Sequence, residues 1–122
     1  MSVIAVIGAS TDRSKFGNKA LRAFRAQGHT AIPINPHQPM VEGERAYASV
    51  LDYPGTIDEA TLYVPASVGV QVVREIARKG IPTLWLNPGA DAPEVVASAK
   101  AAGLAPIIAC SILAVGESPG DY

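Results

Sequence analysis

Short apolar runs alternate with segments of helical periodicity along most of the chain. The runs are rich in β-branched residues and too short for helices, which is typical of strands buried in a parallel sheet. We expect strands at residues 3–7, 30–35, 60–64, 82–86 and 104–109. We expect helices between them, at about residues 17–27, 67–79 and 92–102. This alternation predicts an α/β protein with a parallel sheet of about five strands and helices on both faces.

Glycine, proline and small polar residues mark where these elements begin and end. A glycine follows each predicted helix and suits the left-handed conformation that ends one: Gly28, Gly80 and Gly103. Ser67 is expected to cap the second helix, and Asp91 with Glu94 resembles a capping box for the third. Pro33 lacks an N–H group, so its strand is predicted near an edge of the sheet. A short helical turn is expected near Ser49.

The segment from Val3 to Gly17 joins a strand, a turn of small residues and the start of a helix. In Gly8-Ala9-Ser10 every side chain is small, so backbone N–H groups can approach a ligand closely. The positive end of the helix that begins near Gly17 points toward the same turn. This pattern predicts an anion site. The alternative is an ordinary strand-to-helix loop whose small residues serve packing only.

Length and composition limit the class of protein. The chain has 122 residues, 48% of them apolar, which suits one domain with a proper core. We assign residues 1–110 to that domain and 111–122 to a C-terminal tail that is loosely ordered or packed on a partner. The net charge of −1 argues against a nucleic-acid partner. One cysteine, no signal peptide before the first strand and no bilayer-length apolar run predict a cytoplasmic protein without a membrane partner.

Positive charge is concentrated beside the small-residue turn. Five of the 10 basic residues lie between positions 12 and 25, against one acid, Asp12. Lys19, Arg22 and Arg25 recur every three residues and fit one solvated helix face. Arg13 and Lys15 precede that helix, in the loop. They are therefore the better candidates for contact with a phosphate.

The end of the second strand bears on the choice of nucleotide. A dinucleotide fold for NAD usually carries Asp or Glu there, to hold the ribose 2′-hydroxyl. This chain has Asn35 at that position, and the next carboxylate is Glu42. The turn also lacks the G-x-G-x-x-G spacing, since no glycine lies between Gly8 and Gly17. Both points weaken NAD as the ligand without excluding another nucleotide.

Four strand ends carry small or proline-containing turns, which should line one rim of the sheet. In this order, the turns resemble the CoA-binding protein family, whose fold is similar to the CoA-binding domain of the succinyl-CoA synthetase α subunit. The resemblance covers about residues 3–110 and implies a single doubly wound, Rossmann-like domain. The matching pieces are Val6-Ile7-Gly8-Ala9-Ser10, Lys15 with Gly17, Pro33-Ile34-Asn35-Pro36, Gly43 with Tyr47, Val64-Pro65, Trp85-Leu86-Asn87-Pro88-Gly89 and Ala102-Gly103-Leu104.

The resemblance also implies a set of residues that bind coenzyme A. The pyrophosphate would be held by Gly8, Ala9, Ser10 and Lys15. The ADP ribose would be bordered by Asn35 and Pro36, the adenine flanked by Val64 and Pro65, and the rim closed by Asn87, Pro88 and Gly89. With Arg13 and Gly17 from the loop, these residues form the expected cofactor site. Relatives often have Gln in place of Asn87, and an acid-Arg-Cys sequence where this chain has Ile108-Ala109-Cys110.

The residues of a catalytic or metal centre are not evident in the sequence. No two histidines and no Cys/His cluster stand at metal spacing. Cys110 has no neighbouring histidine to activate it, and His37 could contact a phosphate from the rim. Tyr47 and Tyr63 fit packing positions with surface hydroxyls, and Trp85 fits the core.

The sequence therefore favours a stand-alone module that binds coenzyme A or an acyl-CoA without chemistry of its own. An NAD(P)-linked oxidoreductase, an acyl-CoA enzyme completed by a partner, and a scaffold with a vestigial pocket remain as alternatives. Self-association is compatible with the apolar edges of such a sheet, but the sequence does not fix the number of subunits.

Overall fold

A computed structural model describes all residues, 1–122, and its centre is a five-stranded parallel sheet in the order β2-β1-β5-β6-β7. The fold class expected from the sequence is confirmed. The sheet strands are β1 (Val3–Ile7), β2 (Thr30–Ile34), β5 (Glu59–Leu62), β6 (Thr83–Leu86) and β7 (Ile107–Ile108). The helices are α1 (Phe16–Ala26), α2 (Ala66–Lys79), α3 (Pro93–Ala101) and α4 (Ser111–Ala114).

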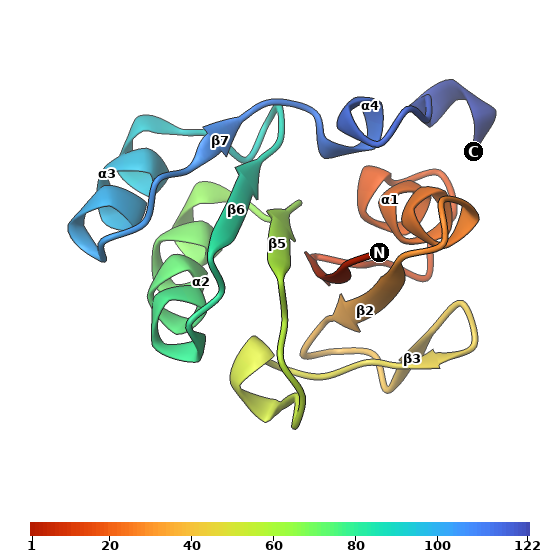
Figure 1. The fold of residues 1–122 in the computed structure, drawn as a ribbon, viewed down its shortest axis with the longest axis horizontal. Helices are drawn as coiled ribbons and strands as arrows, with labels where there is room; N and C mark the ends of the chain where they lie inside the picture. Colours follow the sequence, from red (N-terminus) through yellow and green to blue (C-terminus); the bar gives the residue numbers. More distant parts are fainter.

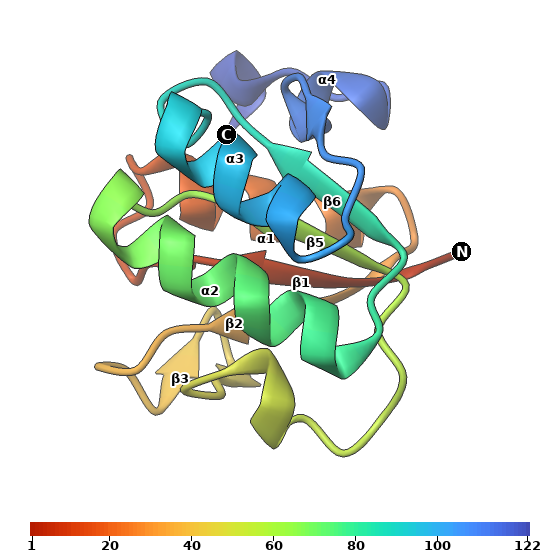
Figure 2. The ribbon, with the colours of Figure 1, turned by 90° about the vertical axis from the view of Figure 1, so that its left-hand side faces the viewer.

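Helices cover both faces of the sheet, as Figures 1 and 2 show. On one face α2 and α3 pack over a core of 16 buried residues, among them Leu62, Ile76 and Leu86. On the other face α1 and α4 pack over 10 buried residues, including Val6 and Phe24. Successive residues of a strand point to opposite faces, so each apolar run supplies both cores. None of the helices combines the length and apolar character needed to cross a bilayer.

Strand β2 forms one edge of the sheet, as Pro33 predicts. The carbonyl of Pro33 accepts a hydrogen bond from the Tyr47 N–H (3.0 Å) on the side away from β1. The nitrogen of Pro33 points the same way as its carbonyl, so the missing N–H leaves no gap in the β1–β2 ladder.

The helix ends are predicted correctly in part. Gly28, Gly80 and Gly103 all have positive φ and follow helices α1, α2 and α3. The predicted caps are wrong. Pro65 is the N-cap of α2, with Ser67 inside the helix, and Ala92 is the N-cap of α3. Asp91 accepts instead from the Gly89 N–H (3.3 Å). Because Pro93 takes the first helical position, the N-cap of α3 is Ala92, one residue later than expected.

A small hairpin, β3 (Met40–Val41) with β4 (Glu44–Arg45), lies between β2 and β5 and is absent from the sequence-based prediction. Its two turn residues, Glu42 and Gly43, both have positive φ, which is unusual for glutamate. The helical turn near Ser49 is confirmed as the 3₁₀ helix η1 (Val50–Asp52), capped by the Ser49 hydroxyl.

The tail packs against its own domain, so the expectation of a loose or partner-bound tail is wrong. Ile112 of α4 is fully buried in the α1 core. The Tyr122 ring lies 5.5 Å from the Arg22 guanidinium of α1, near η2 (Pro119–Asp121). Figure 1 shows α4 and the C-terminus beside α1. The last strand is shorter than predicted, because the chain pairs with β6 only at Ile107 and Ile108.

Candidate functional site

The order of the strands reverses at β1. From β1 the chain crosses to β2 on one side and then returns past β1 to β5 on the other. In such sheets the carboxyl ends of the two strands at the reversal open into a crevice where ligands bind. Here those ends are Ile7-Gly8 and Leu62-Tyr63, and two adjoining cavities lie there, both lined by Gly8 and Val64.

The first cavity, of about 370 Å³, lies at the start of α1, and we call it the helix-start cavity. It is lined by Gly8, Lys15, Phe16, Gly17, Tyr63, Val64, Pro65, Pro88, Gly89 and Ala90.

The second, of about 350 Å³, is mostly lined by aliphatic side chains, and we call it the apolar cavity. It is lined by Ile7, Gly8, Ile34, Asn35, Pro36, His37, Ala48, Val50, Val64, Val68, Gln71, Val72 and Glu75.

Gly8 and Gly17 allow the backbone to pack closely beside the helix-start cavity. A Cβ atom on Gly8, whose φ is +91°, would lie 2.4 Å from the Tyr63 carbonyl oxygen. A Cβ atom on Gly17 would lie 2.3 Å from the Gly8 carbonyl oxygen. No other residue type fits either position without a backbone shift, so the helix start sits directly on the β1 turn.

Two helix N-termini reach the cavities without caps. Helix α1 has no side-chain cap and no acid in its first turn, and the N-cap residue Lys15 lines the helix-start cavity. Helix α2 likewise has neither, and its N-cap residue Pro65 lines the same cavity. Free N–H groups, two positive dipole ends and the Lys15 side chain therefore favour an anionic group at this place.

Two polar residues of α2, Gln71 and Glu75, line the apolar cavity and are not among the site residues predicted from the sequence. One face of α2 supplies Val68, Gln71, Val72 and Glu75, which follow helical spacing. Val68 is 44% exposed, and the buried face of α2 consists of Gly69, Val73 and Ile76. The spacing of 68, 71, 72 and 75 is the signal that could have identified the cavity-facing side. The Glu75 carboxylate accepts from the Ser49 hydroxyl (2.6 Å).

Asn35 connects the tip of β2 to the β1 turn. Its side-chain Nδ2 donates to the Ala9 carbonyl (2.8 Å), and its Oδ1 accepts from the His37 N–H (2.7 Å). Both Asn35 and His37 line the apolar cavity. The asparagine thus fixes the relative positions of two of the four predicted turns.

Asn87 lies at the tip of β6, and the residue is 1% exposed. Its Nδ2 donates to the Thr61 hydroxyl (2.6 Å) and the Leu62 carbonyl (2.8 Å). Its Oδ1 accepts from the Ser111 N–H and hydroxyl (both 2.9 Å). The amide therefore uses its full hydrogen-bonding capacity within the protein. It holds α4 against the sheet, and its neighbours Pro88 and Gly89 line the helix-start cavity.

Tyr63 belongs to the same buried network, so the expectation that its hydroxyl lies at the surface is wrong. The hydroxyl lies 3.2 Å from the Ser111 hydroxyl. Burial raises the pKa of Tyr63 to about 12, because the ionised phenolate would lose its hydration. Trp85 is half-buried and donates from Nε1 to Glu59 (2.9 Å) instead of filling either core.

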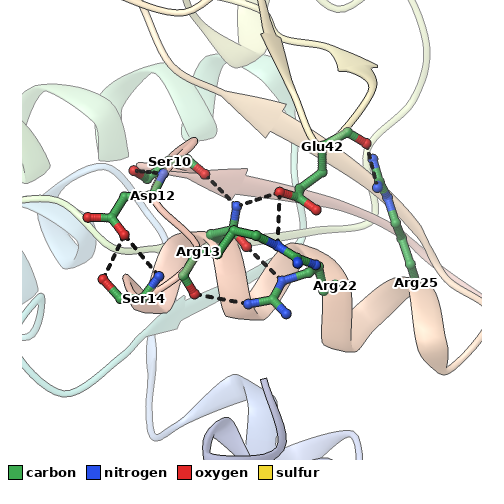
Figure 3. A network of polar contacts seen from close by, with 8 residues as sticks. Ser10, Asp12, Arg13, Ser14, Arg22, Arg25 and Glu42 are labelled. Atoms are coloured by element: carbon green, nitrogen blue, oxygen red, sulfur yellow. Dashed lines mark hydrogen bonds and ion pairs between the residues drawn. The ribbon is translucent and has the colours of Figure 1, made fainter.

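The other predicted loop residues lie outside the two cavities. Ala9 is fully buried, and the Ser10 carbonyl accepts from Asn18 Nδ2 (2.8 Å). The Arg13 guanidinium lies 3.5 Å from the Glu42 carboxylate, on the side of the β3–β4 turn (Figure 3).

Asp12 orders the same loop. Its Oδ1 accepts from the Ser14 N–H (2.9 Å) and hydroxyl (2.6 Å), and these hydrogen bonds lower the pKa of Asp12. In this loop Asp12 is hydrogen-bonded to Ser14, and Arg13 is paired with Glu42. Lys15 is therefore the cation that lines the helix-start cavity.

A doubly wound sheet with an anion-favouring cavity and an apolar cavity at its strand reversal is an arrangement typical of nucleotide-binding folds. Comparison with known sequences narrows that class. The pattern of a family described as "CoA binding domain" matches residues 2–116. The chain belongs to this family, as the resemblance of its strand-end turns indicates.

Relatives and solved structures agree with that assignment. The α subunit of acetate–CoA ligase [ADP-forming] II from Pyrococcus furiosus is 38% identical over 79 residues, 64% of this chain and 17% of the relative. A conserved hypothetical protein from the same organism has a TM-score of 0.83 at 30% identity, covering 93% of this chain and 99% of that one. The dinucleotide-forming acetyl-coenzyme A synthetase 1 of Ca. Korarchaeum cryptofilum, in its apo form, has a TM-score of 0.74 at 29% identity, covering 87% of this chain and 25% of that one.

Proposed function

We propose that this protein binds coenzyme A or an acyl-CoA at the carboxyl ends of β1, β2, β5 and β6. The pyrophosphate would lie in the helix-start cavity, against Gly8, Gly17 and Lys15. The adenosine would lie in the apolar cavity, between Val64 and the Asn35-Pro36 turn. The observation that carries the proposal is the meeting of two uncapped helix N-termini and one lysine at the helix-start cavity.

The cavities suit coenzyme A better than NAD. NAD-binding folds hold the ribose 2′-hydroxyl with a carboxylate at the tip of the second strand, where this chain has Asn35. The carboxylate that lines the apolar cavity, Glu75, comes from α2 and accepts from Ser49. Coenzyme A carries a 3′-phosphate in addition to its pyrophosphate, so cations and free N–H groups favour it.

The predicted binding residues would contribute in different ways. Gly8, Lys15, Gly17, Asn35, Pro36, Val64, Pro65, Pro88 and Gly89 line the cavities and would contact the ligand. Ala9, Ser10 and Asn87 would shape the loops that do so. Arg13 would reach a phosphate only by leaving Glu42, since their side chains are paired in the structure.

The chain spans 17% of the length of the acetate–CoA ligase α subunit that it matches. We infer that binding, without catalysis by this chain alone, is its role, and that any acyl-CoA chemistry would need residues from a partner. The free thiol of Cys110 suits a reducing compartment, so we place the protein in the cytoplasm.

Titration calorimetry with coenzyme A, NAD and NADP tests the proposal on the wild type and two lysine variants. Coenzyme A should bind most tightly. Lys15→Ala should weaken its binding by roughly 1–3 kcal/mol, because a charge-assisted hydrogen bond to phosphate is lost. Lys100→Ala is the matched control, since Lys100 is exposed at the end of α3 and should leave the affinity unchanged.

Two results would contradict the proposal. Tighter binding of NAD than of coenzyme A would reverse the choice of ligand. Equal affinity of the Lys15→Ala and Lys100→Ala variants would remove the phosphate from the start of α1.

A further inference from the structure

A separate cavity of about 470 Å³ lies along the outer edge of β2. It shares no lining residue with the helix-start cavity or the apolar cavity. Its walls include the β2 backbone from Thr30 to Pro33, together with Arg25, Arg45, Tyr47 and Tyr53. Figure 1 shows this edge of β2 facing the β3 segment, with no further sheet strand beyond it.

The β2 backbone presents hydrogen-bonding groups to this edge cavity. The outer side of β2 is bridged only near Ile34, where Tyr47 pairs with it. Pro33 faces outward, so Ala31, two residues earlier in the strand, faces outward as well. Ala31 is 6% exposed and lies beyond the end of that pairing. Its N–H and carbonyl are therefore available to whatever fills the edge cavity.

Arg25 forms part of the wall of the same cavity. Its Nη1 donates to the Glu42 carbonyl (2.9 Å), which fixes the guanidinium, as Figure 3 shows. Its Nη2 is buried and has no hydrogen-bond partner in the structure. The Glu44 carboxylate lies 3.6 Å from that nitrogen, too far for a hydrogen bond. Nη2 therefore has Glu44 as its ion-pair partner and is closed to solvent, so Arg25 supports the cavity wall and its positive charge, while the reachable donors come from elsewhere.

The remaining walls combine a second cation with aromatic surface. The Arg45 guanidinium lies 5.0 Å from the centre of the Tyr47 ring. The Tyr47 and Tyr53 rings meet edge to face, with 5.4 Å between their centres. A planar apolar group can pack against such rings, while the two guanidiniums exceed the single acid, Glu44, in charge.

We propose that the edge cavity binds a small carboxylic acid with a planar apolar body. The carboxylate would accept from the Ala31 N–H and Arg45, and the planar body would lie on Tyr47 and Tyr53. The site is independent of coenzyme A, because it draws on a different edge of the sheet.

The test uses ¹⁵N NMR spectra of the full chain with sodium benzoate as the probe, added to about 20 mM. The Ala31 amide should shift and saturate. Benzyl alcohol keeps the ring without the charge, and acetate keeps the charge without the ring, so each should bind at least about tenfold more weakly. Arg45→Gln should weaken benzoate by about tenfold, and Arg74→Gln, an exposed arginine of α2, should not change it.

Tyr47→Leu gives a second variant with a similar expected loss, because it removes ring surface from the cavity wall, and its folded spectrum provides the check on structure. The proposal is overturned by the absence of a saturating shift at Ala31, by equal shifts with benzyl alcohol, or by unchanged benzoate affinity in folded Arg45→Gln. Saturating shifts confined to Lys15 and Gly17 would also overturn it, because they would place benzoate in the helix-start cavity.

Discussion

Two strands of the sheet end in the same Asn-Pro pair, Asn35-Pro36 after β2 and Asn87-Pro88 after β6. At the first tip the asparagine lines a cavity and ties the β1 turn to β2. At the second tip the asparagine is buried and makes all its hydrogen bonds to Thr61, Leu62 and Ser111. The asparagine of the same dipeptide lines a cavity in one place and is buried in the other.

The difference arises from what lies above each tip. The β2 tip meets the small-residue turn of β1, which leaves open space. Helix α4 covers the β6 tip and supplies Ser111 as a partner for Asn87. An asparagine at a strand end is thus no guide to ligand binding until the chain that covers it is known.

The largest contrast should come from the glycines beside the two tips, Gly8 in the β1 turn that meets the β2 tip and Gly89 after β6. Gly8→Ala should destabilise the protein by more than about 3 kcal/mol, because the new Cβ meets the Tyr63 backbone. Gly89 has a φ of +92°, but a Cβ there would have no other atom within 4 Å, so Gly89→Ala should cost only about 1 kcal/mol of left-handed strain. Urea unfolding measures both, and equal losses would contradict the close packing of Gly8 against the Tyr63 backbone.

The second largest contrast should come from replacing the two asparagines. Asn87→Ala leaves buried partners without hydrogen bonds and should cost about 3 kcal/mol in unfolding free energy. Asn35→Ala loses two bonds at a half-buried site and should cost about 1 kcal/mol, with the larger effect falling on coenzyme A affinity. Thermal unfolding with and without coenzyme A separates the two, and a larger stability loss for Asn35→Ala would refute this ranking.

A smaller effect should appear at high pH, through the network at the second tip. The pKa of Tyr63 is raised to about 12 by burial, above the value of about 10 in the unfolded chain. The protonated form is therefore favoured by folding, and its contribution is full below pH 10 and lost as the pH rises toward 12. The loss should be roughly 2 kcal/mol. Tyr63→Phe should show a shallower decline of stability in this range, and an identical decline would reject the assignment.

The sequence predicts the sheet, its edge strand and the turn glycines, because these follow from local periodicity and backbone sterics. It does not reveal the hydrogen bonds that Asn87 and Tyr63 make with Ser111, because these depend on α4 folding back from residue 111 onward. It fails also at Glu42, because a glutamate with positive φ gives no hairpin signal of its own. The spacing of Gln71 and Glu75 on α2 places them on one face of the helix. To predict that this face lines the cavity, one must also know where α2 lies relative to β1.

The central claim is that coenzyme A binds where the strand order reverses. The shifts of glycine amide signals in a ¹⁵N NMR spectrum test this claim directly, because some glycines line the proposed site and others lie away from it. Addition of coenzyme A should shift Gly8, Gly17 and Gly89 and leave Gly28, Gly80 and Gly103, which end helices, unmoved. Shifts confined to the helix-ending glycines, or no saturating shift at Gly8 and Gly17, would contradict the account.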